Sequence, residues 1–298
     1  MSVDPQDVLD RLLEQQGVVF LLGGIETGKT TFGVDLVRRA TEAGIPAALV
    51  DSDVGQSTIG PPSTVGLKLC AGMSEFTPET LRTADALSFV GSISPRGHLV
   101  PLVAGTAKLV ARAKEAGCRL IVVDTTGVVS GITGQVLKYH KMDLVSPDFV
   151  LAFERGEELE PIVGIAQRFT PAEVIEVDVS TNVIPRSIED RMTFREQQFA
   201  AYFAAGTSRW RVRPTVFMPT LPPDFDPAVL DGLVVGMEDG KGTCAGIGVL
   251  EYDGSEDILR MVSPVTEGVR GLRLGSIRID IDGRSKGPVD LRKLFRTE

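Results

Sequence analysis

The chain has 298 residues, of which 43% are hydrophobic and 24% charged, so its composition is globular and excludes a largely disordered protein. The net charge of −9 argues against a surface that coats nucleic acid broadly, but it leaves room for a local basic groove. Cys70, Cys118 and Cys244 lie far apart and form no C-x-x-C pair, which argues against a disulfide framework or a zinc site and is typical of reduced cytosolic thiols.

The chain begins with an acidic segment, residues 1–16, that lacks the apolar core of a signal peptide. Within it, residues 7–15 are predicted to form a short amphipathic helix that covers the sheet, with Val8, Leu12 and Leu13 on one side. No apolar run approaches the length that spans a membrane. We therefore expect a cytoplasmic protein that contacts no membrane.

A phosphate-binding loop is the strongest single signal in the chain. Residues 18–22 are predicted to form a strand, residues 23–30 fit the pattern G-x-x-x-x-G-K-[ST], and a helix is predicted over residues 29–43. Glycine is needed where backbone N–H groups approach phosphate oxygens, and the lysine and hydroxyl that close the pattern serve the β- and γ-phosphates and Mg²⁺. The residues predicted to bind the phosphates are Gly23, Gly24, Glu26, Thr27, Gly28, Lys29, Thr30 and Thr31, with Thr30 also a metal ligand. The alternative is a glycine-rich turn with an exposed lysine.

Two further predicted strands end in acidic residues. The strand over residues 47–50 runs into Asp51-Ser52-Asp53, and the strand over residues 119–123 runs into Asp124. Ligands of open α/β sheets bind at the carboxyl ends of the strands, and phosphoryl transfer needs carboxylates to hold the metal or to accept a hydroxyl proton. We interpret Asp53 and Asp124 as metal-site candidates; the alternative is an acid that caps the following turn.

Strands and helices alternate through the rest of this region. Residues 59–83 are predicted to be a long loop with room for one strand. The other predicted elements are strands over residues 87–91, 149–153 and 174–177 and helices over residues 99–116, 131–142 and 159–168. This alternation predicts an α/β fold with a parallel sheet covered by helices on both faces.

A helix over residues 187–205 is expected to begin at a capping box of Ser187 and Asp190. Its predicted buried face carries residues at helical spacing: Ile188, Met192, Phe199 and Phe203. Arg191 and Arg195 lie four residues apart on a different face. Spacing alone does not distinguish functional arginines from a solvated face.

From residue 207 the pattern changes to short alternating segments. Strands are predicted over residues 232–236, 244–252, 258–262 and 277–281, and residues 240–242 are predicted to be a hairpin turn. Helical signal is nearly absent. We therefore predict two domains, a P-loop domain of residues 1–206 with a lid helix at 186–205 and a small all-β domain of residues 207–298.

The order of these segments resembles the P-loop polynucleotide 5′-hydroxyl kinases, the family of RNA 5′-kinases of RNA 3′-end formation and pre-ribosomal RNA processing. The resemblance runs from about residue 18 to the C-terminus and is most specific in Asp51-Ser52-Asp53-Val54-Gly55-Gln56, which is similar to the family's acid-x-Asp-x-Gly-Gln element. Residues 89–97 look like its Thr-Pro-Gly clasp with one extra residue, and residues 123–129 resemble its Asn-Thr-x-Gly-Trp strand end. Arg186, Arg191 and Arg195 match its lid segment in spacing, and residues 232–239 and 275–280 resemble its C-terminal β domain.

The resemblance implies an ATP- and Mg²⁺-dependent kinase that transfers the γ-phosphate to the 5′-hydroxyl end of RNA, DNA or both. It implies that Asp53 takes the hydroxyl proton, that Gln56 lies in the same shell, and that Lys29, Arg186 and Arg191 act on the transferring phosphoryl group. The other implied substrate contacts are Ser94, Pro95, Arg96, Gly97 and Thr126. Protein partners and oligomeric state are not predicted.

The chain also departs from the family pattern. Val128 replaces the Trp after the strand-end glycine, Asp124 replaces Asn, Ser94 replaces Thr, and Arg96 is inserted in the clasp. A catalytically silent nucleotide-binding scaffold or assembly ATPase is therefore the alternative to a kinase, whereas a GTPase is disfavoured because no Asn-Lys-x-Asp element occurs. Trp210 could stack on a base or pack between domains.

Overall fold

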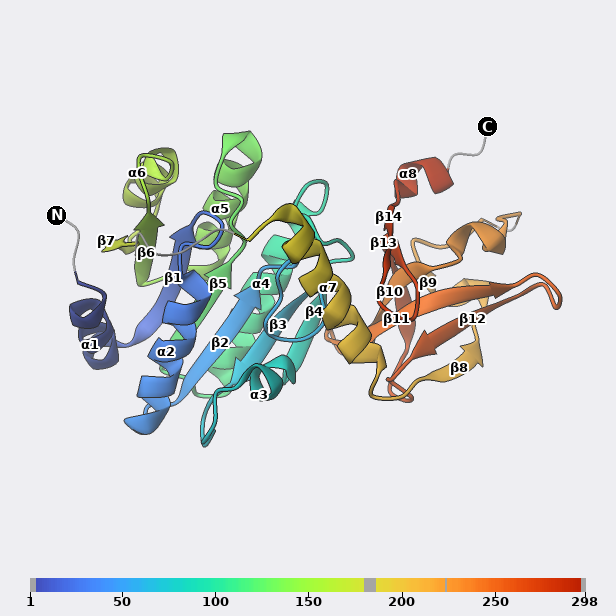
Figure 1. Ribbon diagram of the computed structural model, residues 1–298, viewed down its shortest axis with the longest axis horizontal. Coiled ribbons are helices and arrows are strands. Elements are labelled where there is room, and N and C mark those ends of the chain that lie inside the picture. Colours follow the sequence, from blue (N-terminus) through green and yellow to red (C-terminus); the bar gives the residue numbers. More distant parts are fainter. Residues whose placement is uncertain (1–3, 180–185, 223, 296–298) are drawn as a thin grey trace.

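The computed structural model describes residues 4–179, 186–222 and 224–295. Strands and helices alternate first, in the order α1 (Pro5–Gln15), β1 (Gly17–Gly23), α2 (Lys29–Glu42), β2 (Ala47–Ser52), β3 (Thr64–Leu69), α3 (Pro78–Arg82), β4 (Ala86–Phe89), α4 (Leu99–Glu115), β5 (Leu120–Thr125), α5 (Gly131–Val145), β6 (Phe149–Glu154), α6 (Glu160–Phe169) and β7 (Glu173–Asp178). Then follow α7 (Ile188–Phe203), β8 (Ser208–Arg211), η1 (Pro214–Val216), β9 (Phe217–Met218), η2 (Pro227–Leu230), β10 (Leu233–Glu238), β11 (Cys244–Asp253), β12 (Ile258–Ser263), β13 (Gly271–Ile279), β14 (Ser285–Pro288) and α8 (Leu291–Leu294). The predicted α/β fold followed by C-terminal strands is confirmed (Figure 1).

One end of the sheet is parallel, with the strand order β2-β5-β1-β6-β7. The prediction of a parallel sheet is correct for these strands and wrong for β3, which runs antiparallel to both β2 and β4. Parallel neighbours need a crossover of about a dozen residues or more, usually helical, and the chain between β2 and β3 forms no helix. The predicted loop over residues 59–83 thus contains one strand, β3, together with the short helix α3.

Helices cover both faces of the parallel strands, as the pattern predicts. Along β1, Val18 and Phe20 face a core that α4, α5 and α6 complete, whereas Val19 and Leu21 face a second core built with α1 and α2. The N-terminal helix α1 buries Val8 and Leu12 as predicted, while Leu13 is only half-buried at its edge. No helix among the described residues is long and apolar enough to cross a membrane.

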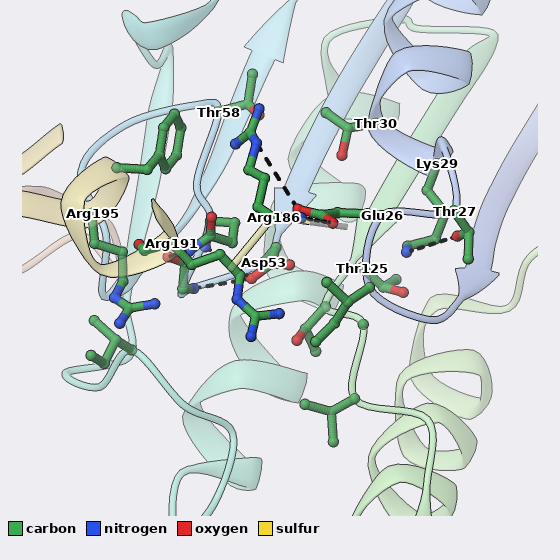
Figure 2. Close-up of a pocket in the computed structure, with 18 of the residues that line it drawn as sticks. Glu26, Thr27, Lys29, Thr30, Asp53, Thr58, Thr125, Arg186, Arg191 and Arg195 are labelled. Carbon is green, nitrogen blue, oxygen red and sulfur yellow. Dashed lines mark hydrogen bonds and ion pairs between the residues drawn. The ribbon is translucent and has the colours of Figure 1, made fainter. Parts of the chain in front are cut away.

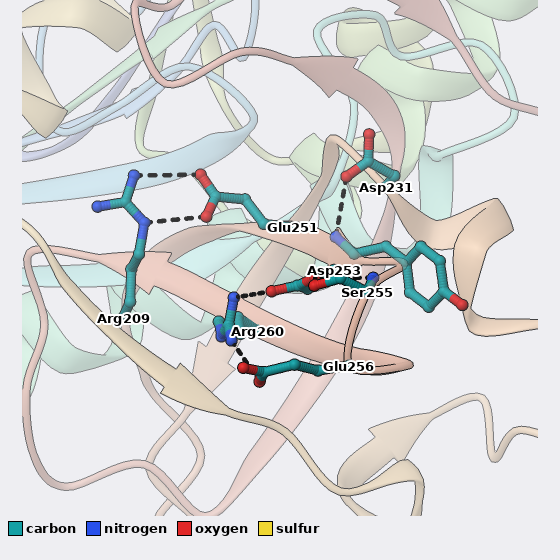
Figure 3. Close-up of polar contacts among 8 residues, drawn as sticks. Arg209, Asp231, Glu251, Asp253, Ser255, Glu256 and Arg260 are labelled. Carbon is teal, nitrogen blue, oxygen red and sulfur yellow. Dashed lines mark hydrogen bonds and ion pairs between the residues drawn. The ribbon is translucent and has the colours of Figure 1, made fainter.

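The C-terminal strands are mainly antiparallel, with β9 parallel to β13, and β11 extends the sheet of the first part by pairing Cys244 with Leu87 of β4. These strands enclose a core of their own, on which Trp210 packs half-buried. The surface of β8, β11 and β12 carries ion pairs of Arg209 with Glu251 and of Arg260 with Asp253 and Glu256 (Figure 3). Exposed pairs of this kind contribute about 0–1 kcal/mol each. The division at residue 206 remains a prediction.

Helix α7 lies between the two parts (Figure 1). Its predicted buried face is correct only in the second half, where Phe199 and Phe203 are buried with residues of β4, β10 and β11. It is wrong for Ile188 and Met192, which are 69% and 44% exposed. The first turns of α7 lie over a cavity and not against the core, so apolar residues at helical spacing in these turns are not buried.

Candidate active site

The carboxyl ends of β1, β2 and β5 open into a cavity of about 700 Å³, with α7 on its far side (Figure 2). Most residues predicted for the site line it together: Glu26, Thr27, Gly28, Lys29, Thr30, Thr31, Asp53, Gln56, Ser94, Pro95, Thr126, Arg186 and Arg191. Five predicted residues do not line it: Gly23, Gly24, Arg96, Gly97 and Asp124. Sequence reasoning missed the apolar lining of Ile25, Ile93, Ile188 and Phe194, for which no local pattern exists.

The phosphate loop has the backbone that its glycines require. Gly28 adopts φ +88° at the N-cap of α2, and no side chain caps that helix. A Cβ on Gly23 would lie 2.6 Å from the Thr27 hydroxyl and 2.9 Å from the Phe153 carbonyl oxygen. The first-turn residues of α2, Lys29 to Thr31, line the cavity, and no side chain caps their N–H groups, which is the arrangement that binds phosphate.

Lys29 is almost completely buried, at 6% exposure. Its amine donates to the Gly24 carbonyl at 2.5 Å and to the Thr27 hydroxyl at 3.3 Å (Figure 2). Burial lowers the pKa of Lys29, and the charges of Asp124 and Asp53 oppose that shift. The amine thus lies inside the loop, within reach of an anion that enters it.

Thr30, which lines the cavity, forms a direct pair with the buried Asp124. The Thr30 hydroxyl donates to Asp124 Oδ2 at 2.5 Å, and the Thr125 N–H donates to Asp124 Oδ1 at 2.8 Å. Burial raises the pKa of Asp124, while Lys29 and the Thr30 hydrogen bond oppose the shift. Because hydroxyl and carboxylate oxygens are hard donors, this pair fits Mg²⁺.

No group of three His, Cys, Asp or Glu side chains that could hold a metal occurs in the described ranges. The side chains of Thr30, Asp53 and Asp124 can therefore supply only part of an octahedral shell. Mg²⁺ usually completes such a shell with water and substrate phosphates. The donor set fits a metal that arrives with a nucleotide.

Asp51 organises the loop that carries Asp53. Its fully buried carboxylate accepts the backbone N–H groups of Asp53, Thr58 and Ile59 at 2.9, 2.5 and 3.1 Å. Burial, reinforced by the charge of Asp124, raises the pKa of Asp51 to about 7. Its oxygens are occupied by the backbone, so Asp51 shapes the loop and leaves the cavity to Asp53.

The Asp53 carboxylate faces the cavity and fixes its own turn, because Oδ1 accepts the N–H groups of Gly55 and Gln56 at 3.0 and 3.1 Å. The Gln56 amide donates to the carbonyl oxygens of Gly55 at 2.8 Å and Arg191 at 3.3 Å. Gln56 thereby links the loop that follows β2 to helix α7.

Three arginines of the lid segment line the cavity: Arg186, Arg191 and Arg195. The predicted capping box is present, since the Ser187 hydroxyl accepts the Asp190 N–H at 3.0 Å and donates to Asp190 Oδ2 at 2.7 Å. The Arg186 backbone N–H donates to Glu26, and the Arg186 guanidinium lies 3.9 Å from the same carboxylate (Figure 2). Burial and the neighbouring Arg191 lower the pKa of Arg195.

The clasp loop is anchored by the C-terminal strands. The Ser276 hydroxyl of β13 donates to the Gly91 carbonyl at 3.1 Å and lies 3.0 Å from His98 Nε2. Ser94 and Pro95 reach the cavity, whereas Arg96 and Gly97 are exposed beside it. The Ser276 contact joins segments about 180 residues apart, so sequence reasoning could not find it.

Comparison with known proteins identifies the family of this chain. The family model described as mRNA cleavage and polyadenylation factor CLP1 P-loop matches residues 23–205. A polyribonucleotide 5′-hydroxyl-kinase of Pyrococcus furiosus is 29% identical over 95% of this chain and 93% of its own, and one of Methanocaldococcus jannaschii is 28% identical over 91% and 90%. The solved wild-type Clp1p–Pcf11p complex contains a chain with a TM-score of 0.70 and 12% identity, covering 91% of this chain and 77% of that chain, a likeness of fold alone. Since the family model spans well over half of the chain, the resemblance read from the sequence is confirmed, and the protein belongs to the CLP1 P-loop family.

Proposed function

We propose that this protein is an ATP-dependent kinase that phosphorylates the 5′-hydroxyl end of RNA. The observation that carries the proposal is that one cavity brings together the phosphate loop with Lys29, the carboxylate of Asp53 and the arginines of α7. The relatives named polyribonucleotide 5′-hydroxyl-kinases support this choice of substrate.

The triphosphate of ATP binds along the phosphate loop. The Lys29 amine donates to phosphate oxygens in place of the Gly24 carbonyl and the Thr27 hydroxyl. Its hydrogen bonds are thus replaced rather than lost, and the negative phosphate lies next to the amine. The side chains of Thr30, Asp53 and Asp124 would hold Mg²⁺, which would neutralise charge that develops on the phosphate oxygens.

The acceptor ribose approaches from the side of the clasp. Asp53 accepts the proton of the 5′-hydroxyl as the hydroxyl oxygen attacks the γ-phosphorus and the bond to the β–γ bridging oxygen breaks, which releases ADP. Ser94, Pro95 and Thr126 bound the space for the terminal nucleotide. Arg186 and Arg191 stabilise the charge on the equatorial oxygens of the loose transition state. The proposed chemistry is thus positioning and charge stabilisation, with no covalent enzyme intermediate.

Labelled ATP and a 5′-hydroxyl oligoribonucleotide test the proposal. We expect label on the RNA with the wild type and none with Lys29→Ala. Lys108→Ala, which changes an exposed lysine of α4, serves as the control and keeps full activity. A 5′-hydroxyl oligodeoxyribonucleotide measured alongside shows whether the acceptor must be RNA.

The same assay tests the alternative function. If the wild type hydrolyses ATP but labels no oligonucleotide, a nucleotide-dependent scaffold or assembly ATPase replaces the kinase. If Lys29→Ala labels RNA as fast as the wild type, the phosphate loop is not the transfer site.

A further inference from the structure

Two lysines of α5, Lys138 and Lys141, are completely buried, at 0% exposure. Neither forms an ion pair with any residue in the described part of the chain. Both lie on the inner face of α5 beside Leu137 and Met142, against the parallel strands. A lysine is almost never fully buried unless it is paired, so these two positions require an explanation.

Each amine donates to a hydroxyl at the carboxyl end of a strand. Lys141 donates to the Ser52 hydroxyl of β2 at 2.7 Å, and Lys138 donates to the Thr125 hydroxyl of β5 at 2.5 Å and to the Thr126 carbonyl at 2.6 Å. Each hydroxyl accepts a hydrogen bond from a lysine amine, so its own proton can be donated to another acceptor.

In both cases the hydroxyl donates a hydrogen bond to a carbonyl oxygen of the neighbouring strand. The Ser52 hydroxyl donates to the Asp124 carbonyl at 2.7 Å, and the Thr125 hydroxyl donates to the Leu21 carbonyl at 2.7 Å. The first relay joins the ends of β2 and β5, and the second joins the ends of β5 and β1. These three ends carry Asp53, Asp124 and the phosphate loop.

Stability alone does not account for the two lysines. A buried amine carries the cost of removing its charged form from water, and burial accordingly lowers the pKa of both lysines. Methionine would fill the same volume on α5 without that penalty. What methionine cannot supply is the directed hydrogen bond that fixes each hydroxyl between two strands.

We propose that Lys141 and Lys138 are positioning residues that hold the three strand ends in register for phosphoryl transfer, an inference that rests on the proposed kinase function. Lys141 acts through Ser52 on the strand that carries Asp53. Lys138 acts through Thr125 on the strand that leads into the phosphate loop. Supporting contacts of this kind typically change activity about 10–100-fold when removed, and small misplacements of reacting groups cost as much.

The two lysines therefore differ in their expected kinetics. Lys141→Met should lower kcat about 10–100-fold with the KM for ATP changed less than kcat, since its relay ends on the Asp124 backbone carbonyl and bonds no phosphate-loop residue directly. Lys138→Met should lower kcat and also raise the KM for ATP about tenfold, since its relay ends at Leu21, two residues before Gly23. A general packing defect would not separate the two constants in this way.

Leu137→Ala is the matched control, because Leu137 is equally buried on the same helix but makes only apolar contacts. It should lower the thermal midpoint and leave kcat within about threefold of the wild type at a temperature where all variants are folded. A wild-type kcat in Lys141→Met, or an equal loss of kcat in Leu137→Ala, would overturn the proposal.

Ser52→Ala tests the relay even if Lys141→Met does not fold. It should reproduce the loss of kcat, and the double variant should lose no more than either single one, because both changes break the same relay. Losses that multiply in the double variant, or a wild-type kcat in Ser52→Ala, contradict a shared relay. A wild type that labels no RNA refutes the kinase itself and this inference with it, whereas an active wild type with unaffected variants refutes this inference alone.

Discussion

Replacing Asp53 by asparagine separates the catalytic role of this residue from its structural role. Asp53 Oδ1 accepts the N–H groups of Gly55 and Gln56, and the amide oxygen of asparagine can accept both in the same geometry. What Asp53→Asn removes is the negative charge and the ability to take up a proton. If Asp53 is the general base, the loss should fall on turnover.

The expected magnitudes follow from these contacts. Removing a general base costs about 10²–10⁴-fold in kcat, or about 3–5 kcal/mol of activation free energy. The two hydrogen bonds weaken from a charged to a neutral acceptor, about 1 kcal/mol each, so the thermal midpoint should fall by only a few degrees. The KM for ATP should change much less than kcat, because the phosphate loop is unchanged and Asp53 is only one of the three side chains proposed to hold Mg²⁺.

The assay is the steady-state transfer of labelled phosphate to a 5′-hydroxyl oligoribonucleotide, with thermal unfolding measured on the same samples. Asp239→Asn is a suitable control, because Asp239 also accepts backbone N–H groups, those of Lys241 and Thr243, in a turn away from the cavity. If Asp53→Asn keeps more than about a tenth of the wild-type kcat, or if the loss lies only in the KM for ATP, Asp53 is not the base.

Three more predictions concern the lid, its anchor and the buried amine. Arg191→Ala should lower kcat about 10³-fold or more while the affinity for ATP, measured by equilibrium binding, changes less than about tenfold; equal losses would make Arg191 a binding residue. Tyr202→Phe should cost about 1–3 kcal/mol of unfolding free energy in a denaturant titration and leave kcat unchanged, because it leaves the Ile247 N–H, bound at 2.9 Å, without its acceptor. An unchanged titration midpoint would show that another group replaces the phenol. Burial lowers the pKa of Lys141 from 10.5 to about 7, so between these pH values the unfolded chain binds more protons and the wild type gains stability as pH rises. The unfolding free energy of the wild type minus that of Lys141→Met should therefore increase from pH 7 to 9, by up to about 1.4 kcal/mol per pH unit, and a constant difference would contradict the assigned shift.

The sequence predicted the parts of the site whose chemistry is local. The phosphate loop is contiguous from Gly23 to Thr30, and the pattern that identifies it includes the strand and the helix on either side. Asp53 and Asp124 were predicted because each follows a buried strand, and parallel strands bring their carboxyl ends to one edge. These features need no knowledge of the rest of the fold.

The errors arise where a residue's surroundings come from distant segments. Ile188 and Met192 have the spacing of a buried face, but a helix that overhangs a cavity leaves such residues exposed. Lys138 and Lys141 present the opposite case, since charged side chains are expected at the surface and these two are buried. Their spacing of three residues, in phase with Leu137 on the same helix, was the available signal.

The contacts that hold α7 explain how the arginines near its first turns can be precisely positioned and still accessible to a substrate. Its second half is fixed by the burial of Phe199 and Phe203 and by the hydrogen bond from Arg82 Nε to Gln198 Oε1 at 2.9 Å. Within the part of the chain that the structure describes, its first half buries no apolar side chain. This half and the residues just before it bond to the rest of the site from Gln56 to Arg191 and from Arg186 to Glu26. Under the proposed roles, the loop after β2, which carries the general base Asp53, and the phosphate loop each contact the segment that carries the charge-stabilising arginines. Binding of a polyanion would replace weak contacts of about 1 kcal/mol or less by charge-assisted ones, so the substrate itself supplies the free energy that completes the site.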